Sequence, residues 1–329
     1  MRSNTAWIKG IRFPVHSVNT LIIGSGAAAL KAAVSLHDRG QDNLAIATEK
    51  WGGGTSNNSG SDKQTYYKLS LSGSASDSPL EMARDLFSGG CMHGDIALCE
   101  AQHSAQAFYE LVSMGVPFPH DGYGGYPGYR TDHDSRGRAT SAGPLTSRYM
   151  FEALSARVIA KGIPVLDRHQ VITLLTGPDQ RGKRVTGAVA LDLGRLDSEN
   201  FGLVLFNAEN VILATGGPGG LYEMSVYPED QIGSIGIALE IGAVAQNLTE
   251  SQFGLASIKF RWNVSGSYQQ VLPRYVSTDA QGEDEHDFLN EYFPDLHTMA
   301  DAIFRKGYQW PFDPRKIAGH GSSLIDQAV

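Results

Sequence analysis

The feature that most constrains the fold is an apolar run that ends in a glycine-rich turn and continues into a helix-forming segment. Residues 18–24 carry three consecutive aliphatic side chains before Gly24, as buried parallel strands do. Residues 30–37 are rich in Ala and Leu, which favour helix. A second apolar run, residues 43–48, follows. This order predicts a βαβ unit with parallel strands.

The turn itself predicts a dinucleotide site. In Gly24-x-Gly26-x-x-Ala29, the first glycine permits a tight turn, the second lets the backbone approach a pyrophosphate, and Ala29 lets helix and strand pack closely. Glu49 lies 23 residues beyond Gly26, near the spacing of about 20 expected for a ribose ligand. The alternative is a plain glycine turn with an exposed Glu49, but all parts of the fingerprint are present and favour the site.

A small-residue loop, residues 51–61, follows the second strand and contains three consecutive glycines. A nicotinamide enzyme normally continues from this strand into another helix. This loop could instead wrap a larger ligand with backbone N–H groups and short side chains, which favours a flavin dinucleotide. The alternative is a flexible surface turn.

Composition excludes several classes of protein. The formal charge of −8 without a basic block predicts no nucleic-acid partner. Cys91 and Cys99 match neither a disulfide framework nor a metal-ligand set, so we expect no metal and two small buried side chains. No run approaches the roughly 20 apolar residues of a membrane span, and no secretory signal is visible. These observations predict a cytoplasmic protein.

The remaining pattern predicts an α/β fold with further elements in order. Helices are expected within 79–114 and over 147–161 and 233–241. Short strands are expected at 164–166, 171–175, 185–192 and 201–206, the last ones as a β-meander, and a second buried strand at 210–217. The long Gly-, Pro- and Tyr-rich stretch 117–146 is predicted to line the substrate side.

Five segments in one order carry a family resemblance: Gly24–Ala29, Glu49-Lys50, 52–60, Leu213-Ala-Thr-Gly-Gly217 and the Gly-Ala helix 233–243. Together they resemble the FAD-dependent fumarate reductase/succinate dehydrogenase flavoprotein family, which includes L-aspartate oxidase and the adenylylsulfate reductase α subunit. The resemblance spans roughly 18–256. It implies a Rossmann-like, glutathione-reductase-type FAD domain at 1–256, and the start of an α+β capping domain at 257–329.

The resemblance also implies the residues that hold FAD. Residues at the diphosphate would come from the first turn and the small-residue loop, Glu49 would bind the adenosine ribose, and Val171 would touch adenine through its backbone. The full implied set is Gly24, Ser25, Gly26, Ala28, Ala29, Glu49, Lys50, Gly53, Gly54, Thr55, Ser56, Ser59, Gly60, Val171, Ala214, Thr215 and Gly216.

Three departures from the family refine the expectation. The loop 52–61 has no histidine, whereas members with covalent flavin carry one there, so FAD is expected to be non-covalent. Gly254 stands near the position of a substrate-binding histidine in the dicarboxylate enzymes, so ordinary fumarate or succinate chemistry is not expected. The chain also stops at Val329, before the family's returning segments, and resembles the N-terminal part of a longer flavoprotein.

Candidate catalytic residues come from two segments. Arg130, His133, Asp134, Arg136 and Arg138 are dense in donors suited to an anionic substrate, and a solvated charged loop is an equal alternative. Arg274 could place a cation over the flavin, although an ordinary surface arginine is the simpler explanation. Of these, Arg274, His133 and Arg130 are the predicted catalytic residues.

The sequence therefore predicts an FAD-dependent oxidoreductase that moves a hydride or electron pair between a small anionic substrate and flavin N5. Because no cluster or haem ligands are visible, a separate electron-transfer protein is an expected partner. Two alternatives stay open. One is an incomplete flavoprotein piece that needs a partner segment and is inactive alone; the other is an NAD-linked Rossmann dehydrogenase.

Overall fold

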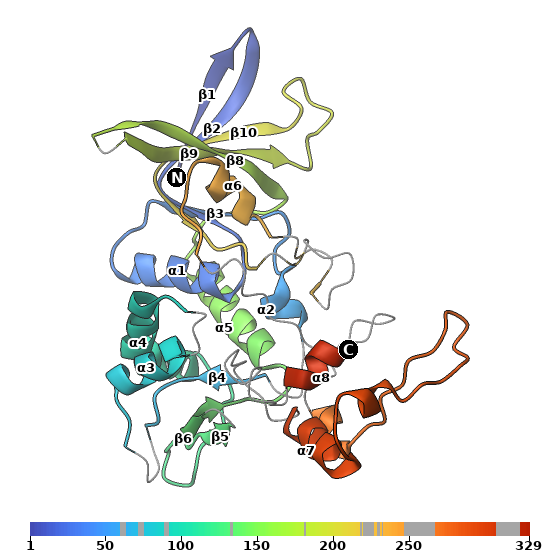
Figure 1. The fold of residues 1–329 in the computed structure, drawn as a ribbon. Helices are drawn as coiled ribbons and strands as arrows, with labels where there is room; N and C mark the ends of the chain where they lie inside the picture. Colours follow the sequence, from blue (N-terminus) through green and yellow to red (C-terminus); the bar gives the residue numbers. More distant parts are fainter. Residues whose placement is uncertain are drawn as a thin grey trace. The chain divides into compact units, whose positions relative to one another are not determined.

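The computed structural model describes residues 1–59, 64–71, 76–88, 92–131, 134–180, 182–217, 219, 227–228, 231, 233–246, 267–306 and 323–329. The chain divides into two compact units (Figure 1). Unit 1 comprises residues 1–59 and 147–245, and unit 2 comprises 60–146 and 246–329. These units do not coincide with the functional division at residue 256, which stays a prediction.

Unit 1 is built on one sheet with the strand order β7-β3-β2-β10-β9-β8, and β1 pairs with β2 outside this path. The strands are β1 (Arg2–Ile8), β2 (Ile11–Ile23), β3 (Leu44–Ala47), β7 (Val165–Leu166), β8 (His169–Asp179), β9 (Gly182–Asp192) and β10 (Leu203–Leu213). Strands β7, β3, β2 and β10 are parallel neighbours, whereas β8, β9 and β10 pair antiparallel. The predicted parallel sheet and β-meander are both present.

The first βαβ unit is confirmed, with longer elements than the sequence indicates. Helix α1 (Ala27–Asp38) contacts both β2 and β3 and buries Leu30, Ala33 and Val34. Strand β2 begins at Ile11 rather than near residue 18, because its first half pairs antiparallel with β1. This N-terminal hairpin was not predicted, since β1 is mostly polar and exposed and Pro14 interrupts the short alternation of Ile11, Phe13 and Val15.

Strand β10 corrects the predicted arrangement of the meander. The sequence indicates two strands, 201–206 and 210–217, but the structure has one continuous strand. Its first half pairs with β9 and most of its length pairs with β2. A single strand thereby joins the meander to the parallel sheet and ends beside β2.

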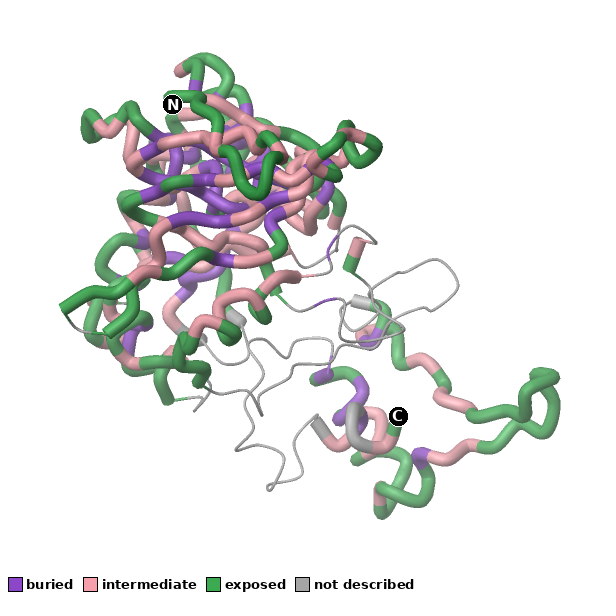
Figure 2. The backbone as a smooth tube through the Cα atoms, turned by 90° about the horizontal axis from the view of Figure 1, so that it is seen from above, coloured by how far each residue is buried: buried purple, intermediate pink, exposed green. Residues whose placement is uncertain are grey.

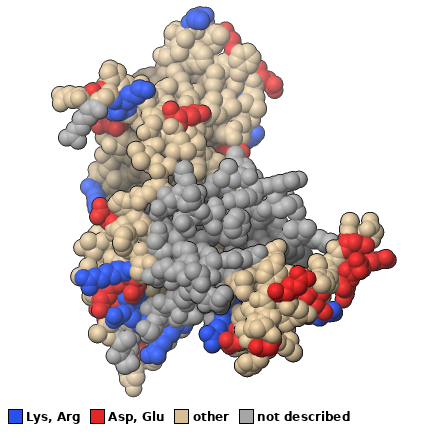
Figure 3. Space-filling view, viewed as in Figure 1, with Lys and Arg blue, Asp and Glu red and all other residues tan. Residues whose placement is uncertain are grey.

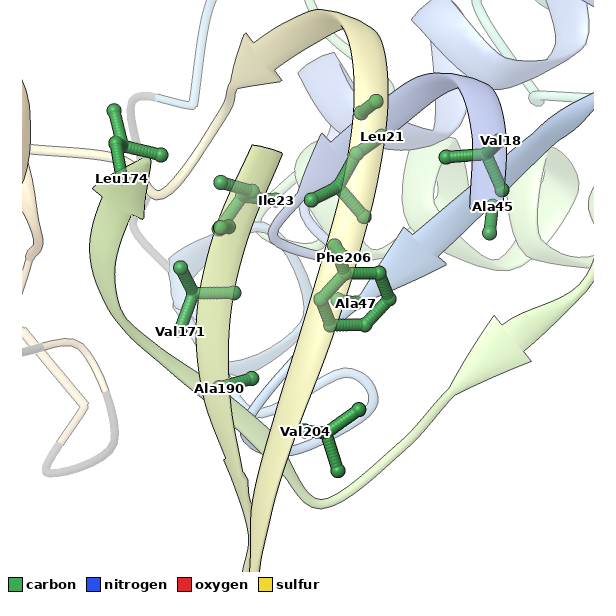
Figure 4. Packing of buried hydrophobic residues seen from close by; sticks show 12 residues of the cluster. Val18, Leu21, Ile23, Ala45, Ala47, Val171, Leu174, Ala190, Val204 and Phe206 are labelled. Atoms are coloured by element: carbon green, nitrogen blue, oxygen red, sulfur yellow. The ribbon is translucent and has the colours of Figure 1, made fainter. Parts of the chain in front are cut away.

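One hydrophobic core cluster of unit 1 lies on the face of the sheet that carries Leu21 and Ile23 (Figure 4). Phe206 and Val204 of β10 and the meander residues Val171 and Ala190 pack in the same cluster. Ile22 points to the other face because strand side chains alternate, and it is also fully buried. The buried stretches in Figure 2 accordingly concentrate in these strands.

The described part of unit 1 contains three further helices. Helix α6 carries Ile237, which packs with the core cluster, and α5 buries Phe151, Leu154 and Val158. A one-turn helix falls inside the predicted small-residue loop. The bounds are α2 (Thr55–Asn58), α5 (Thr146–Ala160, the first residue counted in unit 2) and α6 (Ile235–Glu240).

Unit 2 contains a small sheet with the order β4-β6-β5 and a helix pair, α3 against α4. The stretch 117–146, expected to be irregular, therefore contains two strands. Cys99 on α4 is exposed, so its predicted burial is wrong; Cys91 lies outside the described residues. The bounds are β4 (Tyr66–Tyr67), α3 (Pro79–Ser88), α4 (Gly94–Ser113), β5 (Tyr129–Thr131), β6 (Asp134–Thr140), η2 (Ser267–Val271), η3 (Phe288–Glu291), α7 (Leu296–Lys306) and α8 (Ser323–Ala328).

Among the described residues, no helix combines the length and the apolar character needed to cross a bilayer.

Candidate functional site

A cavity of about 390 Å³ lies in unit 1, where the parallel strands β2, β3 and β10 reach their carboxyl ends. Ligands of open α/β sheets bind at this edge. Three chain segments far apart in the sequence contribute to the lining: 23–28, 47–56 and 214–217. His169, Gln170 and Val171 at the start of β8 complete one wall.

The turn after β2 is shaped by a close backbone approach. Gly24 has a φ of +111°, and a Cβ at this position would lie 2.3 Å from the carbonyl oxygen of Ala214. The Gly24 N–H donates to Ala47 O at 2.9 Å, and the Ala214 N–H donates to Ile23 O at 2.8 Å. Only glycine can occupy this position without moving one of the two neighbouring strand ends.

Ser25 fixes the turn to the end of β3. Its hydroxyl lies 2.9 Å from Thr48 Oγ1 and donates to Lys50 O at 3.3 Å, and it accepts the N–H of Gly52 at 3.3 Å. Ser25 is 7% exposed, so these bonds form out of bulk water. The first turn and the start of the small-residue loop are therefore held together by one short side chain.

The predicted wrapping loop is an ordered segment built around α2. Ser56 Oγ accepts the N–H of Ala27, the first residue of α1, at 3.1 Å. This contact matters because the N-cap residue Gly26 has no side chain to cap α1. The amides of Asn57 and Asn58 both donate to Gly52 O, at 3.0 and 2.6 Å. The loop thus lies against the amino terminus of α1 and is not a flexible surface turn.

Glu49, the predicted ribose ligand, lies at the edge of the same cavity. It follows β3, is exposed, and lines the cavity. Gln170 Nε2 lies 3.4 Å from Glu49 Oε2, which leaves the carboxylate with lone pairs for further donors. The neighbouring Val171 lines the same wall.

Most residues predicted to bind a cofactor come together around this cavity. Ala29 does not line it, since it is fully buried in α1, and Ser59 is also outside the lining, with its hydroxyl 3.4 Å from that of Ser147. Gly60 lies outside the described residues. The remaining members all line it: Gly24, Ser25, Gly26, Ala28, Glu49, Lys50, Gly53, Gly54, Thr55, Ser56, Val171, Ala214, Thr215 and Gly216.

Sequence reasoning missed several side chains of the lining. Tyr227, Gln231 and His169 face the cavity but belong to no motif and no apolar pattern. Gln231 is 8% exposed and hydrogen-bonds to two separate walls of the cavity. No local signal in the sequence could have identified a contact between residues 176 positions apart.

The predicted catalytic residues lie in unit 2. Arg130 is exposed on β5, and His133 lies outside the described residues. Arg274 is exposed and donates to Asp287 through Nε and Nη2, at 2.7 and 2.8 Å, and to Glu285 at 3.1 Å. These hydrogen bonds, that to Asp287 foremost, raise the pKa of Arg274. Figure 3 shows acidic side chains gathered on this part of the chain.

Arg138 differs from the predicted anion-binding or solvated arginine. Its side chain is fully buried on β6 and forms a two-pronged ion pair with Asp77, itself 1% exposed. Burial alone would lower the pKa of Arg138, but hydrogen bonds to Asp77, Tyr67 and Asp85 outweigh it and raise the pKa. Arg136 pairs with Glu81 at 3.0 Å. Within the described part of the chain, these two arginines hold α3 and its preceding segment to β6.

A model of the FAD binding domain family matches residues 19–293. L-aspartate oxidase of Streptomyces coelicolor is 26% identical over 274 residues, covering 82% of this chain and 44% of that protein. The 8-methylmenaquinol:fumarate reductase flavoprotein subunit of Wolinella succinogenes is 27% identical, covering 62% and 32%. The chain thus spans less than half the length of these relatives.

A structure of quinol-fumarate reductase with menaquinol molecules superimposes with a TM-score of 0.67 at 19% identity, covering 92% of this chain and 53% of that one. This likeness confirms the fold class, and the FAD model does not favour the NAD-linked alternative. The match over 19–293, on a fold whose strand ends meet at one glycine-lined cavity, shows that the chain belongs to the FAD binding domain family, with FAD as its cofactor.

Proposed function

We propose that this chain binds FAD non-covalently in the cavity of unit 1 and serves an oxidoreductase that acts on a small anionic substrate. FAD, when bound, supplies the atom, flavin N5, that exchanges a hydride or electron pair with the substrate. The observation that carries the proposal is that the first turn, the small-residue loop and the end of β10 line one cavity. A histidine for covalent attachment is absent from residues 52–61.

The residues present fit a dinucleotide. Gly24 and Gly216 have positive φ angles, and side chains there would run into backbone or into Gln231, so both segments keep the cavity open to a close-fitting ligand. The positive end of the α1 dipole faces the same space, which suits a diphosphate. The carboxylate of Glu49 would accept hydrogen bonds from ribose hydroxyls.

The proposal also assigns catalytic roles to residues of unit 2. Arg130, His133 and Arg274 are proposed to bind the anionic substrate, to polarise it and to handle the proton. A separate electron-transfer protein is proposed as partner, which the description of one relative as a flavoprotein subunit supports. Among the described residues, no group of three or more His, Cys, Asp or Glu side chains could hold a metal.

The decisive experiment measures FAD uptake by the purified chain. We expect a flavin absorbance spectrum after addition of FAD and gel filtration, and release of free FAD on denaturation. Glu49→Ala should weaken FAD binding about 10- to 150-fold, because a hydrogen bond to a charged group contributes about 1.5–3 kcal/mol. Glu199→Ala, at an exposed glutamate of the same unit outside the cavity lining, is the matched control.

The outcomes separate the parts of the proposal. A wild-type chain that stays colourless after incubation with FAD would contradict the cofactor assignment of the cavity. Equal FAD affinity in wild type and Glu49→Ala would remove Glu49 from the ribose position and leave the cofactor assignment intact. Flavin bleaching by candidate donors, followed by reoxidation with fumarate-like acceptors, then tests the substrate class.

A further inference from the structure

Gln231 is a buried polar side chain that connects two walls of the cavity. It is 8% exposed and belongs to none of the segments that carry the family resemblance. One wall is the amino terminus of α2 at Gly54 and Thr55, and the other is the segment after β10. These walls come from parts of the sequence about 160 residues apart, so their separation depends on contacts such as this one.

The amide of Gln231 uses its whole hydrogen-bonding capacity in this position. Its Nε2 donates to Thr215 O at 3.0 Å and to Gly217 O at 3.2 Å. Its Oε1 accepts from the N–H and the hydroxyl of Thr55, both at 3.3 Å. Carbonyl oxygens only accept and a backbone N–H only donates, so the partners themselves fix which way the amide points.

The Thr55 hydrogen bond satisfies an N–H group at the amino terminus of α2. Gly54 is the N-cap residue of α2 and offers no side-chain oxygen to it. The first N–H groups of a helix have no partner within the helix. Gln231 Oε1 takes this role from a distant part of the chain.

Two glycines of the cavity lining make room for the same side chain. A Cβ at Gly216 would lie 2.5 Å from Gln231 Nε2, and a Cβ at Gly54 would lie 3.0 Å from Oε1. Gly216 also has a φ of +77°. The two glycine segments are therefore shaped around Gln231 as well as around the cavity that they line.

We propose that Gln231 is a positioning residue of the cofactor site, which holds α2 and the end of β10 at a fixed separation before FAD enters. This inference rests on the proposed assignment of the cavity to FAD. An already ordered site binds more tightly because less conformational freedom is lost on binding. Gln231 acts through Thr55, Thr215 and Gly217, with no role assigned to it in the chemistry.

Gln231→Glu tests the inference, because it keeps the shape of the side chain and replaces the amide donor with a titratable carboxyl group. An ionised carboxylate would face the carbonyl oxygens of Thr215 and Gly217 and lose both hydrogen bonds, whereas a protonated carboxyl regains one donor. We expect FAD binding about 10- to 100-fold weaker than wild type at pH 8, with much of the loss recovered at pH 5.5. Gln180→Glu adds the same charge at an exposed turn of unit 1 and should match wild type at both pH values.

A second measurement needs no cofactor. Hydrogen exchange of the FAD-free chain should be faster in Gln231→Met than in wild type at both 53–58 and 213–217, because methionine keeps the volume without the hydrogen bonds. This variant also decides the matter if Gln231→Glu fails to fold. Wild-type FAD affinity of Gln231→Glu at pH 8, or unchanged exchange in either segment of Gln231→Met, overturns the inference. A wild type that takes up no FAD would instead contradict the proposed function. The exchange measurement would still test whether Gln231 holds α2 and the segment after β10 together.

Discussion

Replacing Arg138 with methionine is expected to destabilise unit 2 severely, because Arg138 neutralises a buried carboxylate. The guanidinium donates to Asp77 at 2.6 and 2.8 Å and to Asp85 at 2.7 Å. Asp77 is 1% exposed, whereas Asp85 is about half exposed and can turn to water. In Arg138→Met, the donors left to the Asp77 carboxylate among the described residues would be the backbone N–H groups of Ser70 and Ser78.

The magnitude follows from the burial of this pair. Removing one partner of a buried ion pair costs about 3–5 kcal/mol, chiefly because the other charge stays buried without compensation. Methionine retains much of the arginine stem, so a cavity adds little to this cost. Arg148→Met is the matched control, since Arg148 and Glu152 form an i,i+4 pair with both side chains about half exposed, and such pairs contribute about 0.3–0.5 kcal/mol.

The assay is urea unfolding of the full chain, combined with hydrogen exchange in β6 and α3, because two units need not unfold in one transition. The refuting result is a loss of stability in Arg138→Met no larger than that in Arg148→Met. Arg138→Met combined with Asp77→Leu should recover part of the loss, because no buried charge is then left from this pair.

The contribution of Asp77 to the pH dependence of the unfolding free energy should change sign between wild type and Arg138→Met. In wild type, burial acts to raise the pKa of Asp77, but the hydrogen bond and charge of Arg138, together with the backbone N–H groups of Ser70 and Ser78, outweigh it and lower the pKa. Its stabilising effect is therefore present above the unfolded pKa of about 4 and is lost as the pH falls through the folded value. Without Arg138, burial would raise the pKa of Asp77, so acid should narrow the stability gap between the variant and wild type. A gap that stays constant from pH 7 to pH 4 would contradict this account.

Two further predictions concern a glycine and an arginine. Gly24→Ala should cost more stability than Gly40→Ala. Both positions have positive φ, which strains an alanine by about 1–3 kcal/mol, but of the two only a Cβ at Gly24 would collide with Ala214 O. Equal melting temperatures of the two variants would refute the collision. Arg274→Ala should slow turnover while leaving the flavin spectrum intact. Unchanged turnover with candidate donors would refute the catalytic role proposed for Arg274.

The lining of the cavity could be predicted from sequence where the pattern is local. Gly24, Gly26 and Glu49 belong to one βαβ unit whose spacing encodes the turn, the helix start and the end of the second strand. Ala214 and Thr215 could be added because an apolar strand that ends in glycines has the same pattern. Parallel strands then bring both segments to one edge of the sheet, which the structure shows as one cavity.

The sequence was a poor guide where the fold departs from simple periodicity. Strand β10 was predicted as two strands because Asn207, Glu209 and Asn210 interrupt its apolar pattern. These side chains are exposed, while the backbone continues from the pairing with β9 into the pairing with β2. Arg138 was predicted either to bind an anionic substrate or to lie in a solvated charged loop, because its partners, Asp77 and Asp85, lie 61 and 53 residues away.

The same distinction explains why the fingerprint alone does not make a binding site. Its glycines give the backbone freedom, and a flexible backbone has no fixed cavity until something orders it. In this chain, hydrogen bonds of three side chains contribute to that order: Ser25 to the segment after β3, Ser56 to α1, and Gln231 to the segment after β10. Only the first lies within the fingerprint itself. Substitutions at Ser56 or Gln231 should therefore affect FAD binding although every glycine of the fingerprint is intact.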